Sequence, residues 1–253
     1  MAKRHLILMH GFLENYRMWD DVLRGISKKD FVIHTPHLPG HHPSCEALNS
    51  HVTGDYLEAV LQQMSISSAD DVFVVGHSMG GYLASSLVFA MPGRVRGLCL
   101  LHSKCAADDA AKIEQRYRAI EAAKADLSLY VHTMINGQFG ARYAAQDNNK
   151  IKEQITFAKS LSLATIEQSQ MMMLHRPDQL LAMQHRSFPL YYFLGQNDPS
   201  VTMEMAQLEI DKLPGTLAHV EEGIGHMGHW ESTRHVAQFI NRVLFSAFDE
   251  QDV

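Results

Sequence analysis

The chain has 253 residues, of which 46% are hydrophobic, a length and composition that suit one large core better than two separate domains. Lysine and arginine total 22 against 28 acidic residues, so the formal net charge is −6 and no basic block suits a nucleic-acid backbone. No apolar stretch has the length of a membrane span, and the three cysteines lack metal-ligand spacing. These features argue against nucleic-acid and membrane partners and favour a reducing, cytoplasmic compartment.

Six short apolar runs alternate with helical segments along the chain. The first run has only four consecutive strongly apolar residues, too few for a secretory signal, and it is typical of a strand. Alternation of this kind predicts a parallel sheet with helices on both faces, right-handed crossovers and an active site at the carboxyl ends of the strands. The expected strands are residues 5–9, 31–35, 72–75, 97–102, 189–194 and 217–221.

One gap breaks this alternation. About 85 residues separate the fourth and fifth expected strands, far more than a single crossover helix needs. Apolar residues recur at helical spacing in this segment, and a run of three methionines lies near its end. The sequence therefore predicts an α/β core of residues 1–102 and 188–253 with a helical cap, residues 103–187, inserted in it. The methionines could pack the cap onto the core or face the substrate.

A serine lies at the turn from the third expected strand into a helix, in the stretch Gly76-His77-Ser78-Met79-Gly80. A pattern with three fixed positions can arise by chance as a simple Gly-rich loop. Here it follows a buried-type apolar strand and precedes apolar residues at helical spacing, the context of a nucleophile elbow. Ser78 is therefore expected to be a catalytic nucleophile.

A serine hydroxyl attacks poorly by itself and needs a base and an acid that orients the base. His226 follows the last expected strand on a glycine-containing loop, and His229, three residues on, competes with it. We expect His226 to be the base, because it lies at the carboxyl end of a strand. Asp198 follows the fifth strand; it could be an ordinary turn residue before proline, but the chain order of Ser78, Asp198 and His226 is that of an α/β-hydrolase triad.

Backbone amides are expected to stabilise the oxyanion. One is that of Met79, directly after the nucleophile, and the other is that of Phe12, in the loop after the first strand. His10, beside this loop, is expected to be a buried brace rather than a catalyst.

Taken together, these motifs resemble the α/β-hydrolase fold family, in particular its small serine esterases. The matching motifs run from His10 to Glu231, and the resemblance covers nearly the whole chain outside the cap. Two features depart from the family pattern: His37 and His42 flank the Leu38-Pro39-Gly40-His41 stretch in place of the usual aspartate and glycine, and the antiparallel hairpin that opens many relatives is missing. About six parallel strands are therefore expected. The matching stretches are His10-Gly11-Phe12, Leu38-Pro39-Gly40-His41, Gly76-His77-Ser78-Met79-Gly80-Gly81, Asn197-Asp198-Pro199 and Gly225-His226-Met227.

The resemblance implies a cofactor-free carboxylesterase that cleaves a small ester through a Ser78-His226-Asp198 triad and an acyl-enzyme. Carbon-carbon bond hydrolysis, lyase or perhydrolase chemistry with the same triad remains an alternative, as does a non-catalytic receptor for a small ligand. Aspartate-nucleophile chemistry, as in haloalkane dehalogenases, is disfavoured by the serine. A metal site of His226, His229, His41 and His42 is also disfavoured, because the spacing is loose and lacks a carboxylate. The sequence leaves the oligomeric state open.

Overall fold

The computed structural model describes residues 2–146 and 149–249 of the chain. Its six-stranded sheet has the order β2-β1-β3-β4-β5-β6, and every neighbouring pair is parallel, as expected from the sequence. The strands are β1 (Arg4–Met9), β2 (Phe31–His34), β3 (Asp71–His77), β4 (Val95–Leu101), β5 (Leu190–Gly195) and β6 (Leu217–Glu221).

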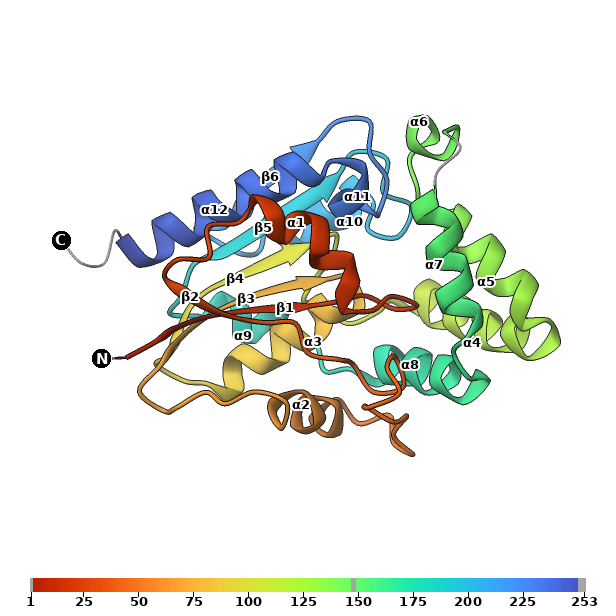
Figure 1. The fold of residues 1–253 in the computed structure, drawn as a ribbon, viewed down its shortest axis with the longest axis horizontal. Coiled ribbons are helices and arrows are strands. Elements are labelled where there is room, and N and C mark those ends of the chain that lie inside the picture. The colour runs from red at the N-terminus through yellow and green to blue at the C-terminus, as the bar shows by residue number, and fades with distance from the viewer. Residues whose placement is uncertain (1, 147–148, 250–253) are drawn as a thin grey trace.

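Both faces of the sheet are apolar, because side chains alternate between them along each strand. Val72 and Val74 of β3 pack on one face, while Phe73 and Val75 pack on the other. The first face is covered by α2 (Thr53–Leu61) and α3 (Met79–Leu87), and the second by α1 (Asp20–Gly25) and α12 (Thr233–Asp249) (Figure 1). The result is a three-layer α/β core.

The direction of chain progression reverses between β1 and β3. The chain starts in the sheet at β1, moves outward to β2, and then crosses back to β3 and onward to β6. Loops that leave the carboxyl ends of strands on either side of such a switch point turn apart, and this leaves a crevice in which ligands bind. The loop after β1 and the turn after β3 flank this point.

Helices fill the long segment between β4 and β5. α4, α5 and α7 stand together beyond the carboxyl ends of the strands, with α8 beside α4 (Figure 1). These helices fall within the segment predicted to be a cap, and its description as a separate unit with boundaries at 103 and 187 stays a prediction. The helices of the segment are α4 (Ala110–Ala125), α5 (Leu127–Asn136), α6 (Ala141–Ala144), α7 (Asn149–Lys159), α8 (Leu163–His175) and α9 (Leu180–Gln184).

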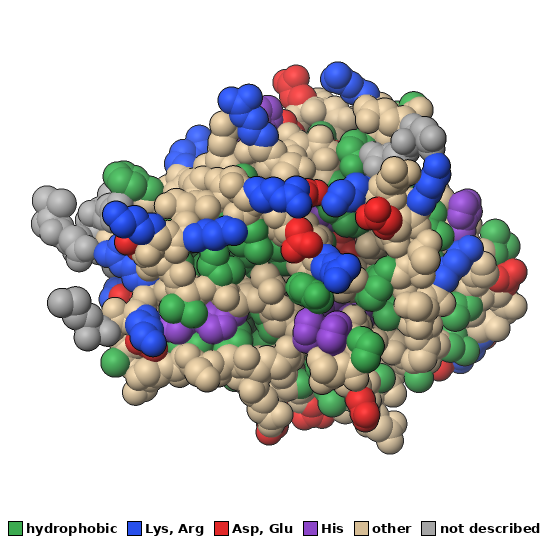
Figure 2. Space-filling view, viewed as in Figure 1, with side chains coloured by type: hydrophobic (Ala, Val, Ile, Leu, Met, Phe, Trp, Pro, Cys, Tyr) green, Lys and Arg blue, Asp and Glu red, His purple; other side chains and the backbone are tan. Residues whose placement is uncertain are grey.

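The remaining elements are short connections around the sheet. Across residues 2–146 and 149–249, no helix combines the length and the apolar character required to cross a bilayer. Lys and Arg side chains are interspersed with acidic ones on the face seen in Figure 2. The short elements are the 3₁₀ turns η1 (Tyr16–Trp19) and η2 (Val88–Ala90), α10 (Met203–Ile210) and α11 (Gly228–Glu231).

Candidate active site

Ser78 occupies a strained backbone position between β3 and α3. Its φ of 50° and ψ of −118° lie where few residues other than glycine are found, and such strain concentrates at functional sites. The turn is tight on both sides of the serine. A Cβ atom on Gly76 would lie 2.5 Å from the carbonyl oxygen of Gly80, and one on Gly80 would lie 2.4 Å from that of His10. Only glycine therefore fits at either position.

The structure brings Ser78, His226 and Asp198 together. His226 Nε2 lies 2.9 Å from Ser78 Oγ, and His226 Nδ1 lies 2.9 and 2.8 Å from the two carboxylate oxygens of Asp198. The Nδ1–H therefore donates to Asp198 and leaves Nε2 free to accept the serine proton. Asp198 follows β5 and His226 follows β6, so both side chains reach the serine from neighbouring strand ends.

Asp198 has a second histidine partner, which sequence reasoning missed. His102 Nδ1 lies 3.0 Å from Asp198 Oδ2, and the backbone amides of Ser200 and Val201 donate to Oδ1 over 2.8 and 2.9 Å. Burial raises the pKa of Asp198, but the His226 charge and the hydrogen bonds of both histidines outweigh it and hold the pKa well below the usual range. Asp198 is therefore an anion with several donors.

His102 lies directly after β4, where the sequence predicts the last residue of a strand. Its φ of 49° takes it out of the extended conformation, and its side chain is fully buried. Burial lowers the pKa of His102 to about 4, so the ring is neutral and donates through Nδ1. Its place at a strand's carboxyl end was the one signal in the sequence that could have identified it.

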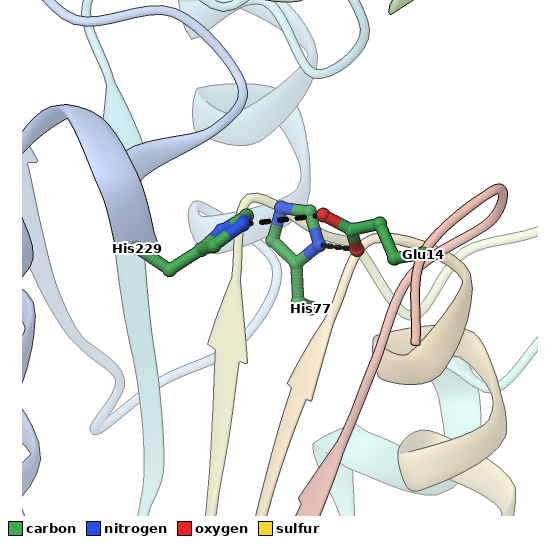
Figure 3. A group of neighbouring side chains, drawn as sticks. All are labelled: Glu14, His77 and His229. Carbon is green, nitrogen blue, oxygen red and sulfur yellow. Dashed lines mark hydrogen bonds and ion pairs between the residues drawn. The ribbon is translucent and has the colours of Figure 1, made fainter. Parts of the chain in front are cut away.

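A second buried group consists of Glu14, His77 and His229 (Figure 3). It contacts the loop that carries His226 through His77. His77 Nδ1 lies 2.7 Å from Glu14 Oε2, and His77 Nε2 lies 2.9 Å from the carbonyl oxygen of His226. Both partners accept, so both ring nitrogens carry protons. Burial lowers the pKa of His77, but Glu14 outweighs it and raises the pKa above its ordinary value. His77 is therefore an imidazolium ion paired with Glu14.

Glu14 also holds the loop after β1. Its Oε2 accepts from the amide of Gly11 over 2.7 Å, and His229 Nε2 lies 3.2 Å from its Oε1. Burial raises the pKa of Glu14, but His77 and His229 outweigh it and hold the pKa well below its ordinary value. His229, the competitor for the role of base, thus faces Glu14, whereas His226 faces Ser78.

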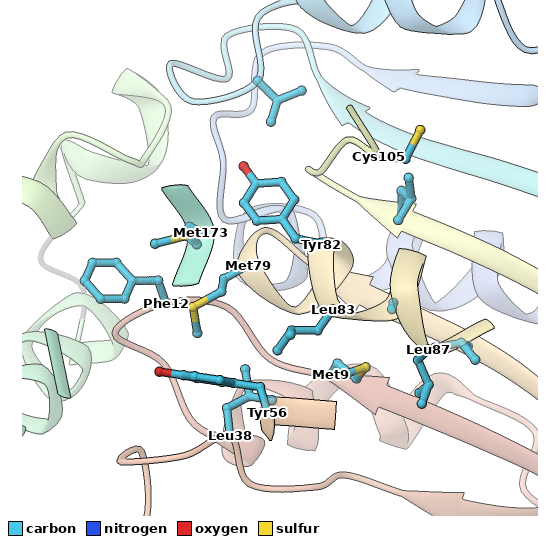
Figure 4. Packing of buried hydrophobic residues seen from close by; sticks show 14 of the residues in the cluster. Met9, Phe12, Leu38, Tyr56, Met79, Tyr82, Leu83, Leu87, Cys105 and Met173 are labelled. Atoms are coloured by element: carbon cyan, nitrogen blue, oxygen red, sulfur yellow. The ribbon is translucent and has the colours of Figure 1, made fainter. Parts of the chain in front are cut away.

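Phe12 and Met79, the expected oxyanion donors, lie on either side of the switch point, after β1 and after β3. Met79 is the first residue of α3, Phe12 follows β1, and both side chains belong to the buried cluster drawn in Figure 4. His10 connects the loop after β1 to the one after β2: its Nδ1 lies 2.9 Å from Gly11 O, and its Nε2 accepts from the amide of Leu38 over 3.1 Å. Burial lowers the pKa of His10 to about 3, as suits a neutral brace.

The loop that carries His226 is fixed from two sides. The carboxylate of Glu231 accepts from the amides of Gly225 and Met227 within the loop, and from the amide of Gly140 in the helical segment. The amide of His226 donates to the carbonyl oxygen of Gln138 over 2.7 Å. The connection between α5 and α6 therefore helps to hold the loop that carries His226.

A pocket of about 70 Å³ lies at Ser78 and shares lining residues with a larger groove of about 590 Å³ between α4 and α5. Phe12, Tyr82 and Met173 line the pocket beside Ser78 and His226. Ala119 and Ala122 of α4 and Leu129 of α5 line the groove. The residues that line both spaces are Lys112, Arg116, Met134, Gln138, Gln170 and Ser200.

Two groups within the described residues have donor atoms close enough to share a metal ion. They are Glu14 with His77 and His229, and His102 with Asp198 and His226. The metal set weighed from the sequence is not assembled in either group, because His226 and His229 belong to different ones and neither contains His41 or His42. The hydrogen bonds described above account for the arrangement of both groups.

Comparison with known proteins places this geometry in a family. The esterase from Thermogutta terrifontis, solved with malate bound, superposes with a TM-score of 0.84 over 97% of this chain and 91% of its own, at 20% identity. The enol-lactonase from Burkholderia xenovorans LB400 superposes with a TM-score of 0.84 over 96% of this chain and 92% of its own, at 15% identity. These likenesses show a shared fold.

In sequence, the chain is 30% identical over 99 residues to the pimeloyl-[acyl-carrier protein] methyl ester esterase of Salmonella newport (strain SL254). That match spans 39% of this chain and 36% of the enzyme. The model of the alpha/beta hydrolase family matches residues 6–240. The chain therefore belongs to the alpha/beta hydrolase family.

Proposed function

We propose that this protein is a serine hydrolase that cleaves small carboxylic esters through an acyl-enzyme formed on Ser78. The observation that carries the proposal is the contact of 2.9 Å between Ser78 Oγ and His226 Nε2, with His226 Nδ1 directed at the Asp198 carboxylate. Esterases among the similar proteins support the choice of an ester as substrate.

In the proposed reaction, His226 removes the Ser78 proton as Oγ attacks the ester carbonyl. Asp198 holds the ring in the required tautomer and stabilises its cation, while the amides of Met79 and Phe12 stabilise the oxyanion. His226 then protonates the leaving alcohol. A water molecule, activated by the same histidine, releases the carboxylic acid and restores the serine.

Replacement of Ser78 by alanine tests the nucleophile. We expect Ser78→Ala to lower kcat/KM for p-nitrophenyl esters by about 10⁴-fold or more, because the remaining groups cannot form an acyl-enzyme. Hydrolysis is measured from the release of p-nitrophenolate across acyl lengths. Ser68→Ala, in the exposed loop before β3, is the matched control and should behave as the wild type.

Two results would contradict the proposal: wild-type protein that cleaves none of these esters, or equal activity in wild type and Ser78→Ala. Labelling with a fluorophosphonate separates the alternatives. A wild type that is labelled at Ser78 but cleaves only diketones would indicate carbon-carbon bond hydrolysis with the same triad. A wild type that resists labelling and binds a small ligand would indicate a receptor.

A further inference from the structure

Basic side chains gather where α4 begins, beside the pocket that contains Ser78. The partly or fully buried charged groups here are four cations, Lys104, Lys112, Arg116 and Arg176, and two carboxylates, Asp108 and Glu209. The group therefore has more positive than negative charges, away from bulk water.

Asp108 is shared among three of the cations. Its side chain is fully buried; it accepts from Arg116 Nε and from Arg176 Nη2, the latter over 2.7 Å, and Lys104 Nζ lies 3.8 Å away. Burial raises the pKa of Asp108, but the two guanidinium groups outweigh it and hold the pKa well below its usual range. The single negative charge of Asp108 thus offsets only part of the positive charge of these three cations.

Glu209 is occupied by other partners. Its carboxylate accepts from the amides of Cys105 and Ala106 over 2.8 and 2.9 Å, and from the Tyr192 hydroxyl over 2.5 Å. The Glu209 carboxylate offsets part of the positive charge of Arg176, but it forms no ion pair with Lys112.

Two of the cations, Lys112 and Arg116, line the pocket directly, and the Arg176 guanidinium lies against the ring of Tyr82 in the pocket wall. The Arg176 guanidinium lies 3.9 Å from the centre of the Tyr82 ring and that of Arg116 lies 5.9 Å from it, and Tyr82 lines the pocket beside Ser78. Lys112 lines both the pocket and the groove between α4 and α5. A ligand at Ser78 therefore meets this wall.

Among the described residues, Lys112 Nζ has no carboxylate partner. Burial lowers the pKa of Lys112, because the charged ammonium group is poorly solvated at this position. Lys112 also lies in the first turn of α4, where the helix dipole favours an anion over a cation. The two carboxylates that line these spaces have other partners: Glu14 pairs with His77, and Asp126 accepts from the Leu129 amide at the start of α5.

We infer that the pocket selects esters that carry an anionic group, a carboxylate or a phosphate, and that Lys112 is the residue that pairs with it. Buried charge in excess is unfavourable unless a partner compensates it, and an anionic substrate would supply that partner. The inference rests on the proposed ester hydrolysis, because it names the class of ester that this site takes.

The test compares matched esters that differ only in charge. Mono-p-nitrophenyl adipate has a carboxylate where p-nitrophenyl hexanoate has a methyl group, and p-carboxyphenyl hexanoate adds the charge to the alcohol side of phenyl hexanoate. A p-nitrophenyl hexanoate with a terminal phosphate forms the third arm. We expect at least one charged ester to exceed its neutral match in kcat/KM by about tenfold, a factor that corresponds to about 1.4 kcal/mol.

Lys112→Met should remove most of this preference, mainly through KM, because the substitution keeps a long unbranched side chain and deletes its charge. Lys124→Met is the control: Lys124 lies on the same helix, pairs with Glu121 and Glu167, and lines neither space, so the preference should persist. The arm that shows the preference identifies a carboxylate or a phosphate as the recognised group.

Binding of monomethyl adipate and methyl hexanoate to the Ser78→Ala variant, measured by calorimetry, separates this inference from the proposed function. A preference for the charged ester that depends on Lys112 supports the inference even if the wild type hydrolyses neither. Hydrolysis without any charge preference, or a preference unchanged in Lys112→Met, overturns it and leaves the proposed function intact.

Discussion

Asp198 accepts hydrogen bonds from two histidines with different environments. His226 can reach Ser78, whereas His102 is fully buried and neutral, with a pKa lowered to about 4 by burial. His102 therefore acts as a fixed donor that holds the carboxylate in the orientation that His226 requires. It is a positioning residue for the proposed triad.

Substitution of His102 tests what its position requires for stability, namely a hydrogen-bond donor and a positive φ of 49°. Asparagine tolerates that conformation and retains a donor, while valine does neither. We expect His102→Val to lower the free energy of unfolding by roughly 3 kcal/mol, from the lost hydrogen bond and backbone strain, and His102→Asn by about half as much. Urea denaturation measures both; equal losses would argue against the two-part explanation.

Among the elements, the loops after β1 and β6 meet the end of β3 at the buried pair of Glu14 and His77. Glu14 holds the amide of Gly11 in the first loop, and His77, directly before Ser78, donates to the backbone of His226 in the second. The pair therefore connects the loop expected to bind the oxyanion to the loop that carries the expected base.

A double-mutant cycle tests this connection. Glu14→Gln and His77→Gln should each lower the free energy of unfolding by about 3–5 kcal/mol, because each leaves a buried charge without its partner. The double variant should lose about 1–3 kcal/mol less than the sum of the two. Denaturation in urea gives the three values.

The exposed pair of Glu114 and Arg118, 3.1 Å apart on α4, is the control, and Glu114→Gln should cost less than about 1 kcal/mol. Strictly additive losses at Glu14 and His77 would show that the two residues act independently.

Across the whole molecule, buried histidines concentrate around the site. His10, His41, His102 and His229 are fully buried, and burial lowers the pKa of His10 to about 3 and those of the other three to about 4. In the unfolded chain these groups regain a pKa near 6.5. Below that pH, the unfolded state binds protons that the folded state excludes.

This difference predicts marked acid sensitivity. The free energy of unfolding should be highest above about pH 6.5 and fall as the pH decreases toward 4, by up to roughly 1.4 kcal/mol per pH unit for each of the four histidines. Below that, protonation of Glu14 and Asp198, whose pKa values are lowered by folding, adds to the loss. Thermal denaturation at successive pH values measures the slope.

Substitution of one buried histidine gives the matched comparison. His229→Gln should reduce the slope between pH 6.5 and 4, whereas His132→Gln, at an exposed position of α5, should leave it unchanged. A stability that stays constant across this range would contradict the origin proposed for the acid sensitivity.

Local patterns in the sequence predicted the fold well. The expected strand at residues 217–221 agrees with β6 at both ends, and the six parallel strands are confirmed. Apolar runs and turn residues are local signals, and each strand carries its own. The fourth strand shows what local signals miss. It ends at Leu101 rather than His102, because His102 has a positive φ. The side chain of His102 contacts Asp198, which lies 96 positions away in sequence.

The sequence by itself determined the parallel strands, the elbow at Ser78, and Asp198 and His226 as its candidate partners, because apolar strand patterns and glycine turns are local features of the chain. Only the tertiary structure placed His102 beside Asp198, joined Glu14 to His77, and gathered four cations, Lys112 among them, with two carboxylates beside the pocket. Such contacts depend on which distant segments the fold brings together in a region that excludes water, and no periodicity or spacing along the chain records that.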